Sequence, residues 1–290
     1  MLKDTRANKL FLIILVILLA LGLAWARGAI SSGRTVVGDT EAIPFAKGDS
    51  LSVSTISHPI VLEIDPGATA VSLEIGSTDR KQLAISRNGS NLSIKVSPKR
   101  RIWIFPVFFG SSSSTLVVTA PPDRIKDLSL ASVSAKVSVL DPLNLDSVAI
   151  SSTSSKVSVL DITAGKMISL SSVSGSVEAG DLKSNGTIDV SSTSGRIETE
   201  SLQAPRITVT SVSGSVDVAL PLASPSKVDL SSTSGKVEAD LLGADDYTID
   251  AHTTSGSITI GGEKRSTLTK GDGSSTIDLQ TISGSISVHP

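Results

Sequence analysis

Short runs of alternating apolar and polar residues fill the chain from about residue 50 onward. Between residues 50 and 118 these runs include "LSVSTI", "IVLEI" and "LSIKV", and such alternation is typical of β-strands with one buried face. Turn-forming residues separate the runs, and Asn88-Gly89 is the strongest hairpin signal among them. We therefore predict a β region over residues 49–127.

The second half of the chain repeats one unit with a period near twenty residues. Stretches such as "SSTSGK" recur, and the small residue after the last Ser gives a common alignment point, called here the anchor. The spacings between successive anchors are 20, 20, 20, 19, 21, 21 and 28 residues. A fixed period indicates one structural unit stacked on copies of itself. The anchors are Ala135, Ser155, Gly175, Gly195, Gly214, Gly235, Gly256 and Gly284.

Columns in this alignment identify the repeated unit. The residue two after the anchor is always Val or Ile, and the residue seven before it is always aliphatic, which favours strands over helices. Ser or Thr stands three before each anchor, and Ser directly before it. Inward-facing residues are expected at positions seven and five before the anchor, and again at positions two before and two after it. The first set is odd-numbered and the second even-numbered, so the alternation shifts by one residue between them. The chain must bend there, with hydroxyls bonding nearby backbone and Gly supplying dihedral freedom.

These columns predict an all-β protein built as a right-handed parallel β-helix, or a close β-solenoid relative, with coils of about 20 residues. Identical residues would stack about 4.8 Å apart from coil to coil. Residues 49–127 are either a separate domain or the first irregular coils, and we expect them to cap one end. We expect Gly261–Ser275 to be a projecting loop and Pro290 to end the final strand.

The first part of the chain predicts export. Residues 10–26 form an uncharged apolar run of seventeen residues, which is at the lower limit for a transmembrane helix. By the positive-inside rule, the preceding cations place the N-terminus in the cytoplasm and the β region outside. The run is either an uncleaved anchor or a signal peptide cut after Ala26. The predicted segments are 1–9 cytoplasmic, 10–26 anchor or signal, 27–48 stem, 49–127 N-terminal β region and 128–290 solenoid repeats.

The apolar segment together with the "SxxSGxVxV" repeat resembles the bacterial putative-adhesin β-strand-repeat family. Within that family the chain is similar to membrane-anchored proteins of Lia-type cell-envelope-stress operons. The resemblance implies a non-enzymatic role outside the cytoplasm at the cell envelope, and it transfers no catalytic residue.

Composition excludes several classes of function. A formal net charge of −2 gives no chain-wide attraction to nucleic acid. The chain has no Cys, which excludes disulfides, thiolate metal sites and cysteine nucleophiles. Its three histidines, which we expect at the surface, lack metal-binding spacing, and no nucleotide-binding motif occurs. We therefore predict no catalytic residue, no cofactor and no metal. The histidines are His58, His252 and His289.

One column of acids is a candidate site. Three residues after the anchor, carboxylates align on four consecutive coils and are expected to face outward. Because Arg196 and Lys236 lie two residues before two of them, the column reads as a solvated stripe of offset charges. The alternatives are divalent-cation binding and general acid/base catalysis on a polysaccharide. This acidic ladder consists of Glu178, Glu198, Asp217 and Glu238.

A second candidate is a basic run followed by aromatics. Between Arg80 and Arg101 there are seven cations and no acid, and "IWIFPVFFG" follows directly. This combination suits docking onto anionic lipid, a wall polymer or an envelope protein. The alternative is that the aromatics plug the end of the solenoid while the cations stay solvated. The docking residues would be Lys99, Arg100, Arg101, Trp103, Phe105, Phe108 and Phe109.

These observations predict a non-enzymatic extracytoplasmic binding or scaffold protein at the bacterial cell envelope, possessing a membrane anchor and acting in envelope stress response. The alternatives are a secreted or surface-displayed adhesin and a polysaccharide-active β-helix enzyme.

Overall fold

The computed structural model describes residues 42–290 apart from 77–78, 80–81, 98–113, 223–225 and 244. No α-helix occurs in this part of the chain. Accordingly, none of the described residues forms a helix long and apolar enough to cross a membrane. The predicted anchor or signal segment, residues 10–26, lies outside the described residues.

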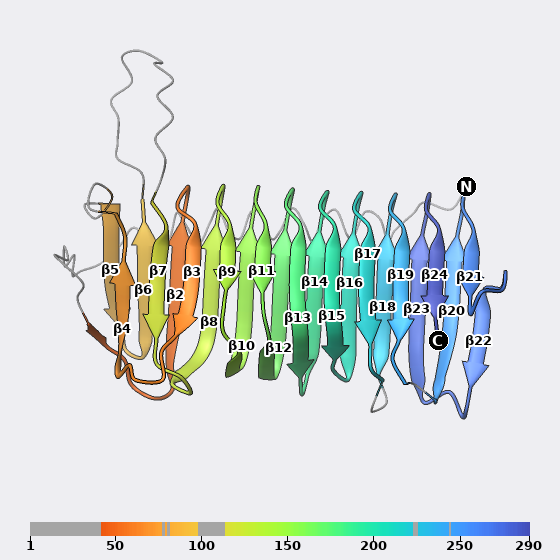
Figure 1. Ribbon diagram of the computed structural model, residues 1–290, viewed down its shortest axis with the longest axis horizontal. Helices are drawn as coiled ribbons and strands as arrows, with labels where there is room; N and C mark the ends of the chain where they lie inside the picture. The colour runs from red at the N-terminus through yellow and green to blue at the C-terminus, as the bar shows by residue number, and fades with distance from the viewer. Residues whose placement is uncertain (1–41, 77–78, 80–81, 98–113, 223–225, 244) are drawn as a thin grey trace, which may run out of the picture. The chain divides into compact units, whose positions relative to one another are not determined.

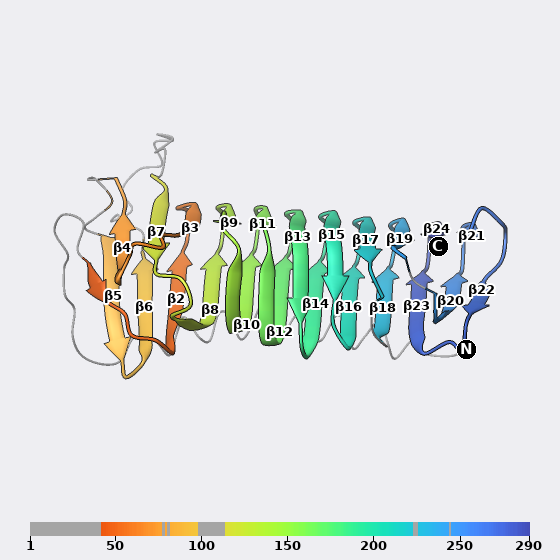
Figure 2. The same ribbon diagram turned by 60° about the horizontal axis from the view of Figure 1, so that its bottom comes forward.

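The β-strands lie side by side in two long rows (Figures 1 and 2). Row A contains, in spatial order, β5 (Leu83–Asn88), β6 (Asn91–Val96), β2 (Asp49–Thr55), β8 (Ile125–Ser132), β10 (Leu143–Ser152), β12 (Ile162–Ser172), β14 (Thr187–Ser192), β16 (Arg206–Ser211), β18 (Lys227–Ser232), β23 (Ser275–Thr281), β20 (Tyr247–Thr253) and β22 (Thr267–Lys270). Row B contains β1 (Ile43–Pro44), β4 (Ala70–Glu74), β7 (Leu116–Ala120), β3 (Ile60–Ile64), β9 (Val137–Val139), β11 (Val157–Val159), β13 (Val177–Ser184), β15 (Ile197–Gln203), β17 (Val216–Leu220), β19 (Val237–Leu241), β24 (Ile286–His289) and β21 (Ile258–Ile260).

Strands within the stack are parallel and keep the register that the repeat columns predict. Val157 pairs with Val137 on one side and Val177 on the other, and all three side chains are fully buried. The aliphatic column seven before the anchor is buried in the same way, as at Val148 and Ile168. The predicted all-β, solenoid-like repeat is thereby confirmed, whereas its right-handed winding stays a prediction.

The coil order at the C-terminal end differs from the order in the sequence. β23 pairs with β18 and with β20, and β24 pairs with β19 and with β21, so the last coil in sequence lies inside the one before it (Figure 1). Pro290 does follow the final strand of the sequence, β24, as expected, but β24 lies between β19 and β21, so Pro290 does not cover the end of the stack. Gly261–Ser275 is also not simply a loop, because it contains β22, which pairs antiparallel with β20 and covers its outer edge.

At the N-terminal end, too, the spatial order of the coils differs from their order in the sequence. β2 lies between β6 and β8, and β3 lies between β7 and β9, so the first coil is inside the second (Figure 2). Outside them, β5, β4 and β1 pair antiparallel with their neighbours. The N-terminal β region shares one hydrophobic core with the repeats, from Phe45 to Val288, and is therefore part of the stack.

The Ser column three before the anchor is a buried hydrogen-bonded ladder. In a typical coil, the Gly195 amide donates to Ser192 Oγ at 2.9 Å, and Ser192 Oγ donates to the Gly175 carbonyl of the preceding coil at 3.2 Å. The same two bonds to backbone groups occur at Ser152, Ser172 and Ser232. The Ser directly before each anchor is exposed instead, as at Ser194.

Two sequence interpretations of this corner need correction. Position two before the anchor faces outward, since Val133 and Ile282 are 37% and 42% exposed; the bend consists of that residue, the Ser after it and the anchor. The anchor glycines do not adopt positive φ. They are required because a Cβ at Gly195 would lie 1.9 Å from the Gly175 carbonyl oxygen, so close coil stacking, rather than dihedral freedom, selects Gly.

Candidate functional site

The acidic ladder lies on the outer surface of row B. Glu178 pairs in register with Glu198, Glu198 with Asp217, and Asp217 with Glu238, across β13, β15, β17 and β19. Successive residues of a strand point to opposite faces, and the neighbouring buried Val and Ile column turns these carboxylates outward. The sequence therefore placed the four side chains correctly on one outward row.

Each carboxylate of the ladder has a cation beside it. Glu178 pairs with Lys156. Arg196 bridges two coils, with Nη2 2.7 Å from Asp217 Oδ2 and Nε 3.5 Å from Glu198 Oε2. Lys236 Nζ lies 2.6 Å from Glu238 Oε2, and His289 Nε2 lies 3.2 Å from Glu238 Oε1. Arg196 thus lies between two like-charged carboxylates that would otherwise repel one another along the stack.

Electrostatics at Glu238 oppose a role as a general acid. The hydrogen bond from Lys236, with further help from His289, outweighs desolvation and lowers the pKa of this carboxyl. A general acid at neutral pH needs a raised pKa. Within the described ranges, no group of three or more His, Asp or Glu side chains is placed to hold a metal ion.

The seven predicted docking residues, Lys99 to Phe109, lie outside the described residues, and their role stays a prediction. Their attachment points are described: β6 ends at Val96 and β7 begins at Leu116. In the adjacent coil, only four residues connect Thr55 to Ile60. The docking sequence is therefore an insertion at one corner of the stack.

His58 is buried, contrary to the expectation that all three histidines lie at the surface. His252 and His289 are exposed, as expected, whereas His58 is only 4% exposed. It lies in the four-residue corner between β2 and β3, next to Asp79 from the β4–β5 connection. Sequence spacing gave no signal for this burial, because the covering segments come from a later coil.

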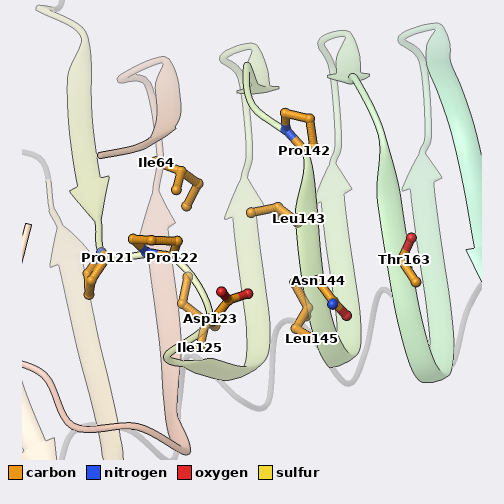
Figure 3. Close-up of a pocket in the computed structure, with 10 residues that line it drawn as sticks. All are labelled: Ile64, Pro121, Pro122, Asp123, Ile125, Pro142, Leu143, Asn144, Leu145 and Thr163. Atoms are coloured by element: carbon orange, nitrogen blue, oxygen red, sulfur yellow. The ribbon is translucent and has the colours of Figure 1, made fainter. Parts of the chain in front are cut away.

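A pocket of about 200 Å³ lies at another corner, where β3, β7, β8 and β10 begin or end (Figure 3). Most of its lining is apolar, and Asp123 supplies the one charged group. Sequence analysis missed this site, although the prolines of "APPD" and "DPL" could have indicated a rigid corner. The lining residues are Ile64, Pro121, Pro122, Asp123, Ile125, Pro142, Leu143, Asn144, Leu145 and Thr163.

Solved structures with similar folds come from several bacteria. A structure described as a putative lipid binding protein from Parabacteroides distasonis is 15% identical, with a TM-score of 0.51, and the match covers 87% of this chain and 96% of that chain. A structure described as a putative adhesin from Bacteroides fragilis is 10% identical, with a TM-score of 0.48, covering 88% of this chain and all of that chain (100%).

No curated protein matches the chain. The family model described as Toastrack DUF4097, by contrast, matches residues 49–289. This range covers both the N-terminal β region and every repeat, and the chain therefore belongs to the Toastrack DUF4097 family.

Proposed function

We propose that this chain is a non-enzymatic binding or scaffold protein of the bacterial cell envelope that acts in the envelope stress response. Residues 10–26 anchor it, the N-terminus is cytoplasmic, and the right-handed β-solenoid lies outside the membrane. The observation that carries the proposal is the outward surface of row B, where side chains repeat from coil to coil and every carboxylate of the acidic ladder is paired with a cation. Such a surface offers regular contacts, and its aligned carboxylates are held in ion pairs rather than free to transfer protons.

One similar structure supports a binding role. The Parabacteroides distasonis structure is described as a putative lipid binding protein, and this description concerns contact with another molecule rather than a reaction.

The basic and aromatic insertion is the proposed contact with an anionic surface. Replacing Lys99, Arg100 and Arg101 by Gln should weaken binding of the full chain to vesicles containing an anionic lipid, or to isolated wall polymer. The lost binding should be the part that depends on salt, because exposed charges are screened within about 10 Å at 0.1 M ionic strength. A control triple variant should neutralise Lys166, Lys183 and Lys227 on the stack. Binding that is equal in both variants would contradict the docking role.

The location is tested by the intact mass of the mature protein from fractionated native cells. A full-length chain in the membrane fraction supports the anchored protein. A chain that begins at Arg27 in the soluble or surface fraction supports the second candidate, a secreted or surface-displayed adhesin.

A polysaccharide-active enzyme remains the alternative of a different class, and it makes its own prediction. If the chain were such an enzyme, the wild type would release soluble glycan products and the Glu198→Ala and Asp217→Ala variants would not. Because the two carboxylates share Arg196, we expect no product from any of the three proteins. Release by the wild type alone would overturn the non-enzymatic proposal.

A further inference from the structure

Asp123 has an unusual backbone conformation at the edge of the pocket. Its φ is +53°, and it is the one residue other than Gly with positive φ in the described part of the chain. The turn follows Pro121 and Pro122, whose rings restrict the backbone before it. L-residues are disfavoured in this region, although Asp and Asn tolerate it better than most. The fold therefore holds a carboxylate at a position where Gly would be easier to accommodate.

The carboxylate of Asp123 has no hydrogen bond or ion pair among the described residues, whereas its neighbours are occupied. Asp65 Oδ1 accepts from the Gly67 amide at 2.8 Å, and Asp141 Oδ2 accepts from the Ile64 amide at 2.7 Å. The adjacent Arg124 forms no ion pair with Asp123 among the described residues; its Nη1 donates to the carbonyls of Phe45 and Thr69 at 3.1 and 3.2 Å. The negative charge at the pocket is left available.

The rest of the pocket is suited to an aliphatic chain. Ile64, Pro122, Ile125, Pro142 and Leu143 supply apolar walls. Figure 3 places the Asp123 carboxylate between Pro122 and Asn144. An uncharged apolar ligand would cover this carboxylate without pairing it, which is unfavourable. An anion would be repelled, and the lining contains no aromatic ring on which a sugar could stack.

We propose that the pocket binds the side chain of a lysine from a partner protein. The four-carbon stem packs against the proline and leucine walls and the ammonium group pairs with Asp123, beside Asn144. Lysine combines a compact cation with an apolar stem, which matches one carboxylate at the edge of an apolar pocket. The volume of about 200 Å³ accommodates one such side chain. This inference rests on the proposed binding role and names the chemistry of the partner.

The test is a titration of the full chain, in detergent and labelled at Ile and Leu methyl groups, with the peptide acetyl-Ala-Lys-Ala-amide. The Ile64, Ile125 and Leu143 methyl resonances should shift with saturation, while those of Ile277 and Ile286, at the other end of the stack, should not. The same peptide with an Nε-acetylated lysine should cause no such shift. Asp123→Asn tolerates the same φ and removes only the charge, and it should weaken binding on the order of fivefold or more. The matched control, Asp65→Asn, should leave binding unchanged.

The methyl spectrum itself reports whether Asp123→Asn has kept the fold. Asp123→Gly, which fits positive φ without strain, supplies a second variant for the loss of charge. The proposal is overturned if no saturable shift occurs, if the acetylated peptide binds equally well, or if both Asp123 variants bind as the wild type does. These outcomes are independent of the cellular fraction that contains the protein and of vesicle binding, so failure of the envelope role would be recognised separately.

Discussion

His58 Nε2 lies 3.4 Å from Asp79 Oδ2, and this pair connects the first coil to the segments that border the insertion. Asp79 Oδ2 also accepts from Ser114 Oγ at 2.8 Å, and Asp79 Oδ1 accepts from Gln82 Nε2 at 2.9 Å. Through its carbonyl, Gln82 accepts from the Ser97 amide at 3.1 Å. Asp79 thus organises contacts to both residues that flank the insertion, Ser97 and Ser114.

Removing the Asp79 side chain should destabilise this end of the stack. In Asp79→Ala, the Ser114 hydroxyl and the Gln82 amide lose their acceptor, and the loss of such partly buried hydrogen bonds costs about 1–3 kcal/mol. Urea unfolding should show the change. Asp65→Ala is the control, because Asp65 is exposed and its side chain accepts one bond from Gly67, so its effect should stay within about 0.5 kcal/mol. Equal effects in the two variants would contradict the organising role of Asp79.

The same residue should make stability depend on acid pH. Burial alone would raise the pKa of Asp79, but the hydrogen bonds from Ser114 and the charge of His58 together lower it below the ordinary value of 3.8. A carboxyl whose pKa is lower in the folded state stabilises the fold above the unfolded pKa, and this contribution disappears as pH falls through the folded pKa. The stability difference between wild type and Asp79→Asn should therefore shrink below about pH 4. A difference that is constant from pH 6 to about pH 2 would be inconsistent with the lowered pKa.

Ser192 and Ser194 form a matched pair for testing the hydroxyl ladder. Ser192→Ala leaves the Gly195 amide and the Gly175 carbonyl without their bonds to Oγ, and we expect a loss of about 1–3 kcal/mol. Ser194, two residues later, is exposed, and Ser194→Ala should change stability by less than about 0.5 kcal/mol. Chemical denaturation of both variants measures the contrast. The ladder would have no energetic role if the two variants unfolded alike.

Gly195 and Gly165 test why the anchors are glycines. A Cβ at Gly195 would meet the Gly175 carbonyl oxygen at 1.9 Å, whereas a Cβ at Gly165 has its nearest neighbour at 3.5 Å. Gly195→Ala should therefore force adjacent coils apart and destabilise by about 3 kcal/mol or more, as overpacking against rigid backbone does. Gly165→Ala should remain near neutral. Thermal melting of both variants decides the point, and a mild effect at Gly195 would show that the coils can separate at low cost.

The β22 cap should prevent association between stacks. β22 pairs antiparallel with β20, and Lys270 Nζ pairs with Asp245 at 2.6 Å. Replacing residues 264–273 with a flexible linker of equal length would uncover the backbone groups on the edge of β20, and uncovered edges promote pairing between chains. Light scattering should show association that increases with concentration. Asp272→Ser keeps β22 and should leave the mass unchanged; an unchanged mass in the linker variant would mean that other features protect this end.

The repeat period and the aliphatic columns predicted the strands and their inward side chains, because these depend on local alternation. Val157 and Ile168 are buried in the positions that their columns indicate. The same alternation placed Glu198 and Asp217 on the outer face. That Arg196 pairs with both of them could not be predicted in this way, because the pairing depends on the distance between adjacent coils. Because each coil packs against near-copies of itself, the sequence of one unit is enough to predict this part of the fold.

The ends of the stack and both polar corners were decided by tertiary structure. Every repeat carries the same columns, so local pattern does not distinguish whether Gly284 stacks on Gly256 or on Gly235; in the structure it lies between them. The burial of His58 and the pocket at Asp123 likewise depend on segments that arrive from other coils. Sequence by itself determined the unit and its inward face, whereas long-range packing determined the order of the terminal coils and which polar groups they enclose.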